Sequence, residues 1–324
     1  MRWLNQQDRD DSGVVALIVV LTIPLLLLAA ALAIDVSRFS QENSSAQHSA
    51  DATALAVATD CVISGSPLSA ASYADYRKPE QAISGETPVA CGSGQVRIKI
   101  EKDVNGGLVL DRNARQVSKA ATVRWGTPNS ATTAPVVVAQ CSYDTATANG
   151  TTFPSADVII PLGAGAEEDC PGRPPGSFGW LDTGLGGPCS ITTTLNESGN
   201  SVVHGNTGTG NNNPWGCITA AGVGGTLTVP IYAASCFGID PCVAGQDDSA
   251  GNNNWYMILG YAEIELTGWN LRHGTPRTAG AVPDCPGPAA SRSCISGSFV
   301  NFAIQLGSTG PATDFGVKVI YLSE

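Results

Sequence analysis

The chain has 324 residues, of which 37 are glycine, 20 are proline and only 14% are charged. This composition is typical of a mainly β protein with many turns and argues against helical surfaces rich in lysine and glutamate. The net charge is -11, with 12 basic and 14 acidic residues up to residue 155 and 5 and 14 beyond it. Because an acidic surface repels nucleic-acid phosphate, we expect no nucleic acid among the partners.

The first predicted element is an uncharged apolar helix from Gly13 to Ile34. Its length of about 33 Å matches the ~30 Å hydrocarbon core of a bilayer, which predicts a transmembrane helix over residues 13–34. Pro24 should kink this helix rather than end it, because lipid offers the backbone no other hydrogen-bonding partner. A cleaved signal peptide is the alternative, since Ala31-Leu32-Ala33 fits a cleavage pattern, but a signal has only about 7 to 15 apolar residues.

The charges that flank the apolar helix predict its orientation. Arg2 and Arg9 precede it, whereas Arg38 alone follows closely. The positive-inside rule therefore places residues 1–12 in the cytoplasm. We expect a single-pass protein of the cell membrane whose C-terminal part is extracellular.

The helix is predicted to continue outside the membrane over residues 35–62, because no proline or glycine follows until Gly65. Small and apolar side chains recur at steps of three and four residues in this segment. These candidate helix-packing residues are Ala46, Ala50, Ala54, Val57 and Ala58. Such a stripe lets another backbone approach closely, so it packs either on the protein's own domain or on a neighbouring helix.

Beyond the helix the pattern indicates strands and turns. Residues 96–101 alternate apolar and charged side chains, and Asn105-Gly106-Gly107 is expected to turn the chain into a return strand at 108–110. Further apolar runs predict strands near 136–138, 158–160, 227–232, 255–266, 299–306 and 315–322. We expect a mainly β, sandwich-like exported part, divided into a first region over 63–150 and a second, disulfide-rich region over 151–324.

The cysteines indicate an exported disulfide framework, because their number is even and all follow the apolar helix. The disulfide candidates are Cys61, Cys91, Cys141, Cys170, Cys189, Cys217, Cys236, Cys242, Cys285 and Cys294. A zinc site usually contains two cysteines about two to four residues apart, and no two cysteines of this chain lie that close together in the sequence. We expect two short loops, Cys236 with Cys242 and Cys285 with Cys294, and leave the other pairings open.

Motifs of catalysis are absent from the sequence. The three histidines, His48, His204 and His273, lie far apart, and none belongs to an H-E-x-x-H motif. There is no G-x-S-x-G elbow, phosphate-binding loop or complete dinucleotide fingerprint. We therefore expect no enzyme, no cofactor and no metal centre.

Three alternatives stay open on the sequence. The segment 240–254, with Asp247 and Asp248, offers oxygen ligands suited to calcium but lacks the EF-hand spacing. An anchored adhesin or carbohydrate-binding module could use a tryptophan surface, and the candidates for it are Trp180, Trp215, Trp255 and Trp269. An exported hydrolase would need carboxylates that converge from distant parts of the chain.

The N-terminal segment resembles a known family. The helix that begins after Ser12-Gly13, the exit at residues 33–38 (AIDVSR) and the run at residues 49–56 (SADATALA) resemble the N-terminal module of TadG-like proteins. Those proteins are membrane-anchored accessory proteins of the tight-adherence (Flp) pilus. Residues 174–182 and 294–300 resemble, more loosely, exported domains of actinobacterial relatives, while the D-x-S-x-S metal site of some members is absent here.

The resemblance implies a structural or assembly component of a cell-surface pilus apparatus, with the membrane and other proteins of that apparatus as partners. The runner-up functions are the anchored adhesin and, after it, the exported hydrolase.

Overall fold

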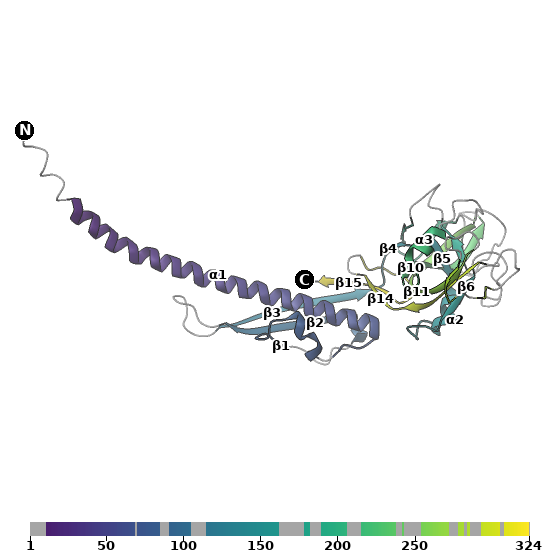
Figure 1. Ribbon diagram of the computed structural model, residues 1–324, viewed down its shortest axis with the longest axis horizontal. Helices are drawn as coiled ribbons and strands as arrows, with labels where there is room; N and C mark the ends of the chain where they lie inside the picture. Colours follow the sequence, from purple (N-terminus) through teal and green to yellow (C-terminus); the bar gives the residue numbers. More distant parts are fainter. Residues whose placement is uncertain are drawn as a thin grey trace, which may run out of the picture.

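The computed structural model describes residues 11–68, 70–84, 91–104, 115–161, 178–181, 189–205, 215–237, 242, 254–271, 278–281, 284–285, 293–304 and 308–323. The molecule is elongated, with one long helix projecting from the end opposite to the larger group of strands (Figure 1). The expected mainly β part that follows one long N-terminal helix is confirmed.

The long helix, α1, runs from Asp11 to Ser64 and has 54 residues. At 1.5 Å per residue it is about 80 Å long, more than twice the thickness of a hydrocarbon core. Pro24 lies inside the helix and does not end it. The helix stops before Gly65, whose φ of 71° is a left-handed conformation that glycine adopts without steric cost.

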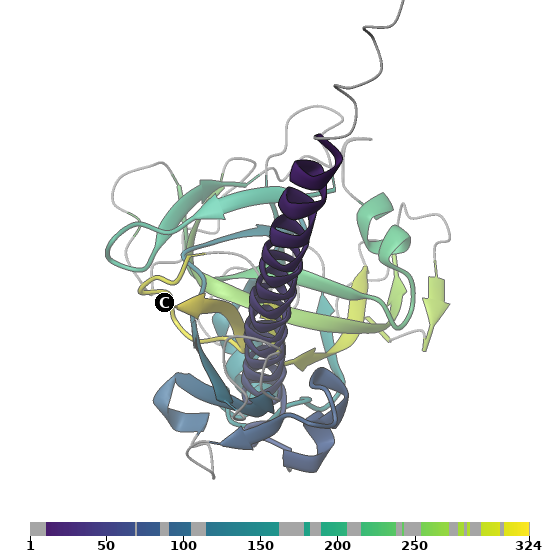
Figure 2. The same cartoon turned by 90° about the vertical axis from the view of Figure 1, so that its left-hand side faces the viewer.

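The first sheet has five strands and lies against the outer half of α1 (Figure 1). Its strands are β1 (Ala82–Ser84), β2 (Gln95–Val104), β3 (Arg115–Gly126), β14 (Phe302–Ile304) and β15 (Val317–Ser323), in the order β1-β2-β3-β15-β14. The short 3-10 helices η1 (Ala70–Tyr76) and η2 (Cys91–Ser93) flank β1 in the chain. Viewed along α1, this group lies below the helix and the larger sheet lies behind it (Figure 2).

The β2–β3 pair matches the predicted hairpin in its first strand. Along β2, Val96, Ile98 and Ile100 are buried, while the intervening Arg97 and Lys99 are exposed. The pair is antiparallel, and its last described rung joins Val104 to Arg115. The expected turn at 105–107 and the return strand at 108–110 lie outside the described residues.

The second sheet has eight strands. Its main path is β6 (Val158–Pro161), β13 (Cys294–Val300), β11 (Asn254–Asn270), β10 (Thr226–Phe237), β5 (Val136–Ala139) and β7 (Phe178–Trp180). β9 (Ser201–His204) and β12 (Thr278–Gly280) also pair with β11, and β4 (Ser130–Thr133) pairs with β8 (Ile191–Thr194) in a separate ribbon. The sequence did not predict the two short helices, α2 (Gln140–Thr147) and α3 (Trp215–Ala221).

Both faces of the second sheet carry apolar side chains. On one face Tyr143 of α2 makes edge contacts with Phe299 and Phe315, at ring-centroid distances of 5.0 and 4.9 Å. On the other face Tyr261 donates its hydroxyl hydrogen to the carbonyl of Thr193 in β8 at 2.8 Å. The sheet is therefore covered by short helices on one side and by the β4–β8 ribbon on the other.

The two sheets exchange strands across the expected regional boundary near residue 150. β5, from the first region, lies in the second sheet, and β14 and β15, from the second region, lie in the first sheet. β15 pairs with β3 from Val319 opposite Gly126 to Ser323 opposite Thr122. A cut at residue 150 would therefore remove two strands from the sheet that carries α1.

Candidate assembly surface

The inner half of α1 is an exposed apolar rod. Its large apolar side chains from Val14 to Ile34 are 41 to 71% exposed. This stretch is the one segment, among the described residues, that is long and apolar enough to cross a membrane, and none of it is buried by the rest of the molecule. A continuous apolar surface of this kind is stable in lipid rather than in water.

The outer half of α1 is docked on the first sheet through the predicted stripe. Ala46, Ala50, Ala54 and Ala58 are 0% exposed and Val57 is 3% exposed. They share a core with apolar residues of β2, β3 and β15, namely Val96, Ile98, Ile100, Val117, Ala121, Val123 and Ile320. Of the two alternatives that the sequence left open, the structure shows docking on the protein's own domain. Alanine fits here because its small side chain lets the sheet approach the helix closely.

The far end of α1 is fixed covalently and by hydrogen bonds. A disulfide joins Cys61, at the end of α1, to Cys91 of η2, with the two Cα atoms 5.1 Å apart. Tyr73 of η1 donates to Asp60 Oδ2 at 2.7 Å and accepts from the backbone of Leu68 at 2.8 Å. Burial, and then the hydrogen bond to Asp60, raise the pKa of Tyr73 to about 12, so the hydroxyl keeps its proton at physiological pH.

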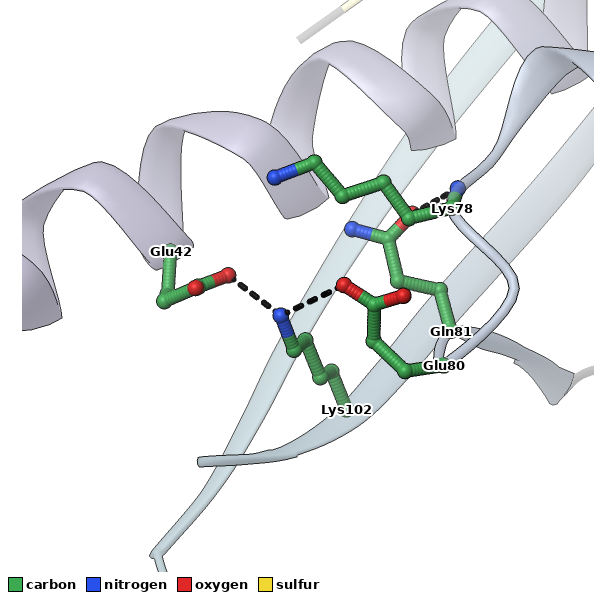
Figure 3. Close-up of polar contacts among 5 residues, drawn as sticks. All are labelled: Glu42, Lys78, Glu80, Gln81 and Lys102. Atoms are coloured by element: carbon green, nitrogen blue, oxygen red, sulfur yellow. Dashed lines mark hydrogen bonds and ion pairs between the residues drawn. The ribbon is translucent and has the colours of Figure 1, made fainter. Parts of the chain in front are cut away.

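The near end of the docked half is held by an ion-pair cluster (Figure 3). Lys102 of β2 donates from Nζ to Glu42 Oε2 of α1 at 2.6 Å and to Glu80 Oε1 at 3.0 Å. The Lys102 side chain is only 10% exposed, whereas Glu80 is 49% exposed. The hydrogen bond with Glu42 is the main cause that raises the pKa of Lys102, and the hydrogen bond from Lys102 lowers the pKa of Glu80.

The cluster lies close to the apolar segment of α1. Glu42 lies on α1 about 12 Å beyond Ile34, counted at 1.5 Å per residue. The loop that carries Glu80 is closed by Gln81, whose Oε1 accepts from the backbone of Lys78 at 3.0 Å. The cluster therefore holds both β2 and this loop against the helix, close to the end of its apolar segment.

Most of the predicted cysteines form disulfides. Disulfides join Cys189 to Cys217, Cys236 to Cys242 and Cys285 to Cys294, in addition to Cys61 and Cys91. Cys141 is also disulfide-bonded, and Cys170 lies outside the described residues. The two short loops expected from the sequence are among these pairs.

The candidate tryptophans whose side chains the structure describes do not gather on one surface. Trp269 is 2% exposed and belongs to the core of the second sheet, where Trp215 also packs. Trp255 is half-buried, with its ring 4.9 Å from the ring of His204. Of Trp180 only the backbone is described, in β7, and Asp247 and Asp248 of the calcium alternative lie outside the described residues.

One carboxyl group is enclosed in the second sheet. Glu263 of β11 is 2% exposed and accepts from Thr228 Oγ1 at 2.6 Å. Burial raises its pKa above the ordinary value. This hydrogen bond joins β10 to β11, so we interpret the Glu263 carboxyl group as a structural one.

Sequence reasoning missed the ion-pair cluster. Lys102 and Glu42 are separated by 60 residues, and each stands in a segment where a charged residue is ordinary. No local pattern marks them, because their meeting depends on where the sheet docks along the helix.

Comparison with known proteins gives a family match for the N-terminal segment. Residues 13–60 match the model of the Flp pilus-assembly TadE/G-like family, which confirms the resemblance found in the sequence. The match covers the apolar half of α1 and most of its docked half, and the β strands lie outside it. No curated protein and no solved structure matches the chain.

Proposed function

Given that residues 13–60 form a Flp pilus-assembly TadE/G-like segment, we propose that the protein is a membrane-anchored, non-catalytic assembly component of a Tad-type pilus apparatus. The observation that carries this proposal is that the matched segment is one uninterrupted helix. Its apolar half is exposed, and its other half packs directly in the core of the β part.

The attachment of α1 suits a structural role. The helix is fixed to the sheet near the membrane by Lys102 and Glu42, and at its far end by Cys61 and Cys91. With both ends held, the sheet cannot swing freely about the helix. The anchor therefore sets the position of the β part above the membrane, as a component that organises other subunits requires.

The orientation is part of the proposal. Arg2 and Arg9 favour a cytoplasmic N-terminus under the positive-inside rule. Disulfides on the other side of the apolar segment agree with this orientation, because they persist in oxidising compartments outside the cytoplasm. The partners are then the lipid bilayer and other proteins of the pilus apparatus.

The non-catalytic role is supported by the sequence, which lacks nucleophile, phosphate-loop and zinc-hydrolase motifs. The contacts that Tyr73 makes with Asp60 and that Lys102 makes with Glu42 join separate parts of the chain, which suits a structural role.

Deletion of the gene in its host tests the proposal. The expected result is loss of surface filaments and of adherence, both restored by the full chain. The proposal is wrong if the deletion leaves both unchanged while the purified exported part turns over a polymer substrate and loses that turnover when one carboxylate is replaced. A reporter enzyme fused after Ser323 and active only outside the cytoplasm checks the orientation separately.

A further inference from the structure

The strand β3 has an open edge beside α1. β15 pairs with β3 only from Gly126 to Thr122, and β2 pairs with the other side of β3 from Arg124 to Arg115. From Arg115 to Ala121, no described strand pairs with the side of β3 that faces away from β2. Figure 1 shows that β2 and β3 continue along α1 past the end of β15.

The open edge presents backbone donors and acceptors. Successive residues of a paired strand direct their N–H and C=O groups to opposite sides. Trp125 donates its N–H to the carbonyl of Gly94, next to β2, at 3.0 Å, so the odd-numbered residues of β3 face β2. The backbone groups of Gln116, Ser118 and Ala120 therefore point to the open edge. Gln116 and Ser118 are exposed, so another molecule can reach this backbone.

The open edge is long for this sheet. The strands at the two ends of the sheet order, β1 and β14, have three residues each and offer little unpaired backbone. The open stretch of β3 runs over residues 115–121, which is about 23 Å at 3.3 Å per residue, and contains no proline. An exposed edge of this kind is a template for another strand.

The neighbouring strand β15 shows how a strand fits beside β3. It contributes Ile320 to the core beneath α1. A strand that continued the line of β15 past Ser323 would pair with residues 116–120 and would lie along the same side of α1. Gln47 of α1 reaches this edge, since its Nε2 donates to the carbonyl of Ala120 in a long hydrogen bond of 3.5 Å. The helix and the open edge therefore meet where the added strand would lie.

Lys119 gives this edge a positive charge. It alternates in step with Val117 and Ala121, which pack beneath α1, so its side chain lies on the helix side of the sheet. Lys119 is half-buried, and among the described residues no carboxylate forms a salt bridge with it. A carboxylate on the added strand would pair with Lys119 in a place partly shielded from water, where a charged hydrogen bond is strong.

A second copy of the chain does not fit this edge. Two copies anchored in one membrane hold their β3 strands at the same height and in the same direction. Pairing through the same edge would set each N–H group opposite the same N–H group of the other copy, and each carbonyl opposite a carbonyl. Donors facing donors form no hydrogen bonds, so the occupant is an extended segment of a different protein.

We propose that the open edge of β3, from Gln116 to Ala120, binds an extended segment of another subunit as an added strand. An acidic side chain of that segment pairs with Lys119. Backbone hydrogen bonds supply the affinity, and Lys119 selects the segment. This inference rests on the proposed function, because it states how the protein holds another subunit of the apparatus.

Amide hydrogen exchange of the purified full chain tests whether the edge is open. The amides of Gln116, Ser118 and Ala120 should exchange at least about tenfold faster than those of Val117 and Lys119, which face β2. Equal protection of the two sets would show that the chain itself covers the edge and would overturn the proposal.

Photo-crosslinking in the native host identifies the occupant. The full chain carries benzoylphenylalanine at Gln116 or, as the matched control, at Arg97, which is exposed on β2. The expected result is an adduct from Gln116 alone, which mass spectrometry maps to a segment of another protein that contains an aspartate or a glutamate. No adduct, equal adducts from both positions, an adduct between two copies or a segment without an acidic residue would overturn the proposal.

Two pairs of variants test the contacts, with benzoylphenylalanine kept at Gln116. Ser118→Pro removes one N–H group from the open edge and should reduce the adduct about tenfold, whereas Ser118→Ala keeps that group and should not. Lys119→Glu should also reduce the adduct about tenfold, whereas Lys99→Glu should not, because Lys99 faces away from the helix. A lysine in place of the captured acidic residue should restore the adduct with Lys119→Glu. Equal reductions within either pair would contradict the proposed strand.

Ser118→Pro also separates this inference from the proposed function. If deletion of the gene abolishes filaments while Ser118→Pro assembles normally and keeps the full Gln116 adduct, the edge proposal is wrong and the proposed function stands. If deletion leaves filaments and adherence intact while the adduct still depends on Ser118 and Lys119, the proposed function is wrong and the edge serves another assembly.

Discussion

Lys102 of β2 and Glu42 of α1 lie 60 residues apart in the sequence, and their side chains meet at 2.6 Å where the long helix enters the β part. The disulfide between Cys61 and Cys91 lies at the other end of the same helix-to-sheet contact. Between these two points the helix is buried against the sheet, so α1 and the first sheet form one unit.

Replacement of Lys102 by methionine should loosen the near end of this contact. The ion pair with Glu42 is partly shielded from water, so we expect a loss of about 1 kcal/mol in the free energy of unfolding. Lys99→Met is the control, because Lys99 is 47% exposed and faces away from the helix. Urea unfolding of the purified protein measures both, and an equal loss for the two variants would contradict a specific role for Lys102.

The stabilisation by Lys102 should depend on pH in a defined direction. The pKa of Glu80 is lowered from 4.5, so its contribution is present above that value and is lost as the pH falls through the lower pKa of the folded state. The pKa of Lys102 is raised from 10.5, so its contribution is lost only as the pH rises through that higher folded-state value.

The difference in stability between wild type and Lys102→Met should therefore be constant from about pH 5 to pH 10 and should shrink outside this range. Thermal unfolding across the pH range measures it. A difference that changes most near pH 7 would show that other groups control the contact.

Replacement of Ala50 by leucine should destabilise the docking of α1 on its own sheet. Ala50 is 0% exposed, and a larger side chain there would overpack the core at a cost of about 1 to 3 kcal/mol. Ser44→Leu is the matched control, because Ser44 lies on the exposed side and should unfold like the wild type. If Ala50→Leu unfolded normally, the packing of this stripe against the sheet would be refuted.

Loss of the disulfide at the far end should have a larger effect. Cys61 and Cys91 are 30 residues apart, so replacing both by serine should cost about 3 to 4 kcal/mol through the greater freedom of the unfolded chain. The pair Cys236 and Cys242 is separated by 6 residues and should cost about 2 kcal/mol. Non-reducing peptide mapping first establishes the pairs, and a free Cys61 or Cys91 in the native protein would contradict this account.

The sequence was sufficient to predict the elements that are determined by neighbouring residues in the chain. The apolar segment, the helix end before Gly65, the alternation around Ile98 and the short cysteine loops follow from residues close together in the chain. The stripe at Ala46 and its successors was also visible as a packing surface.

What packs on that stripe could not be read from the sequence, because an alanine stripe suits a sheet and a helix equally well. The addition of β15 to β3 joins positions near residues 319 and 126, and no local pattern records such a pairing. The short helix α2 was missed because it has only 8 residues and follows directly after the strand β5. The hydrogen bond between Gln81 and the backbone of Lys78 was missed for the same reason as the contacts of Lys102, since it exists only in the folded loop.

The most direct test of the central claim separates the anchor from the exported part. In the deletion strain, surface filaments are counted by electron microscopy after complementation with the full chain, or with a chain in which a cleavable signal peptide replaces residues 1–34. Anchored assembly through α1 predicts that the full chain restores filaments and that the released exported part, present at equal amounts outside the cytoplasm, does not. Restoration of filaments by the released part would contradict the claim.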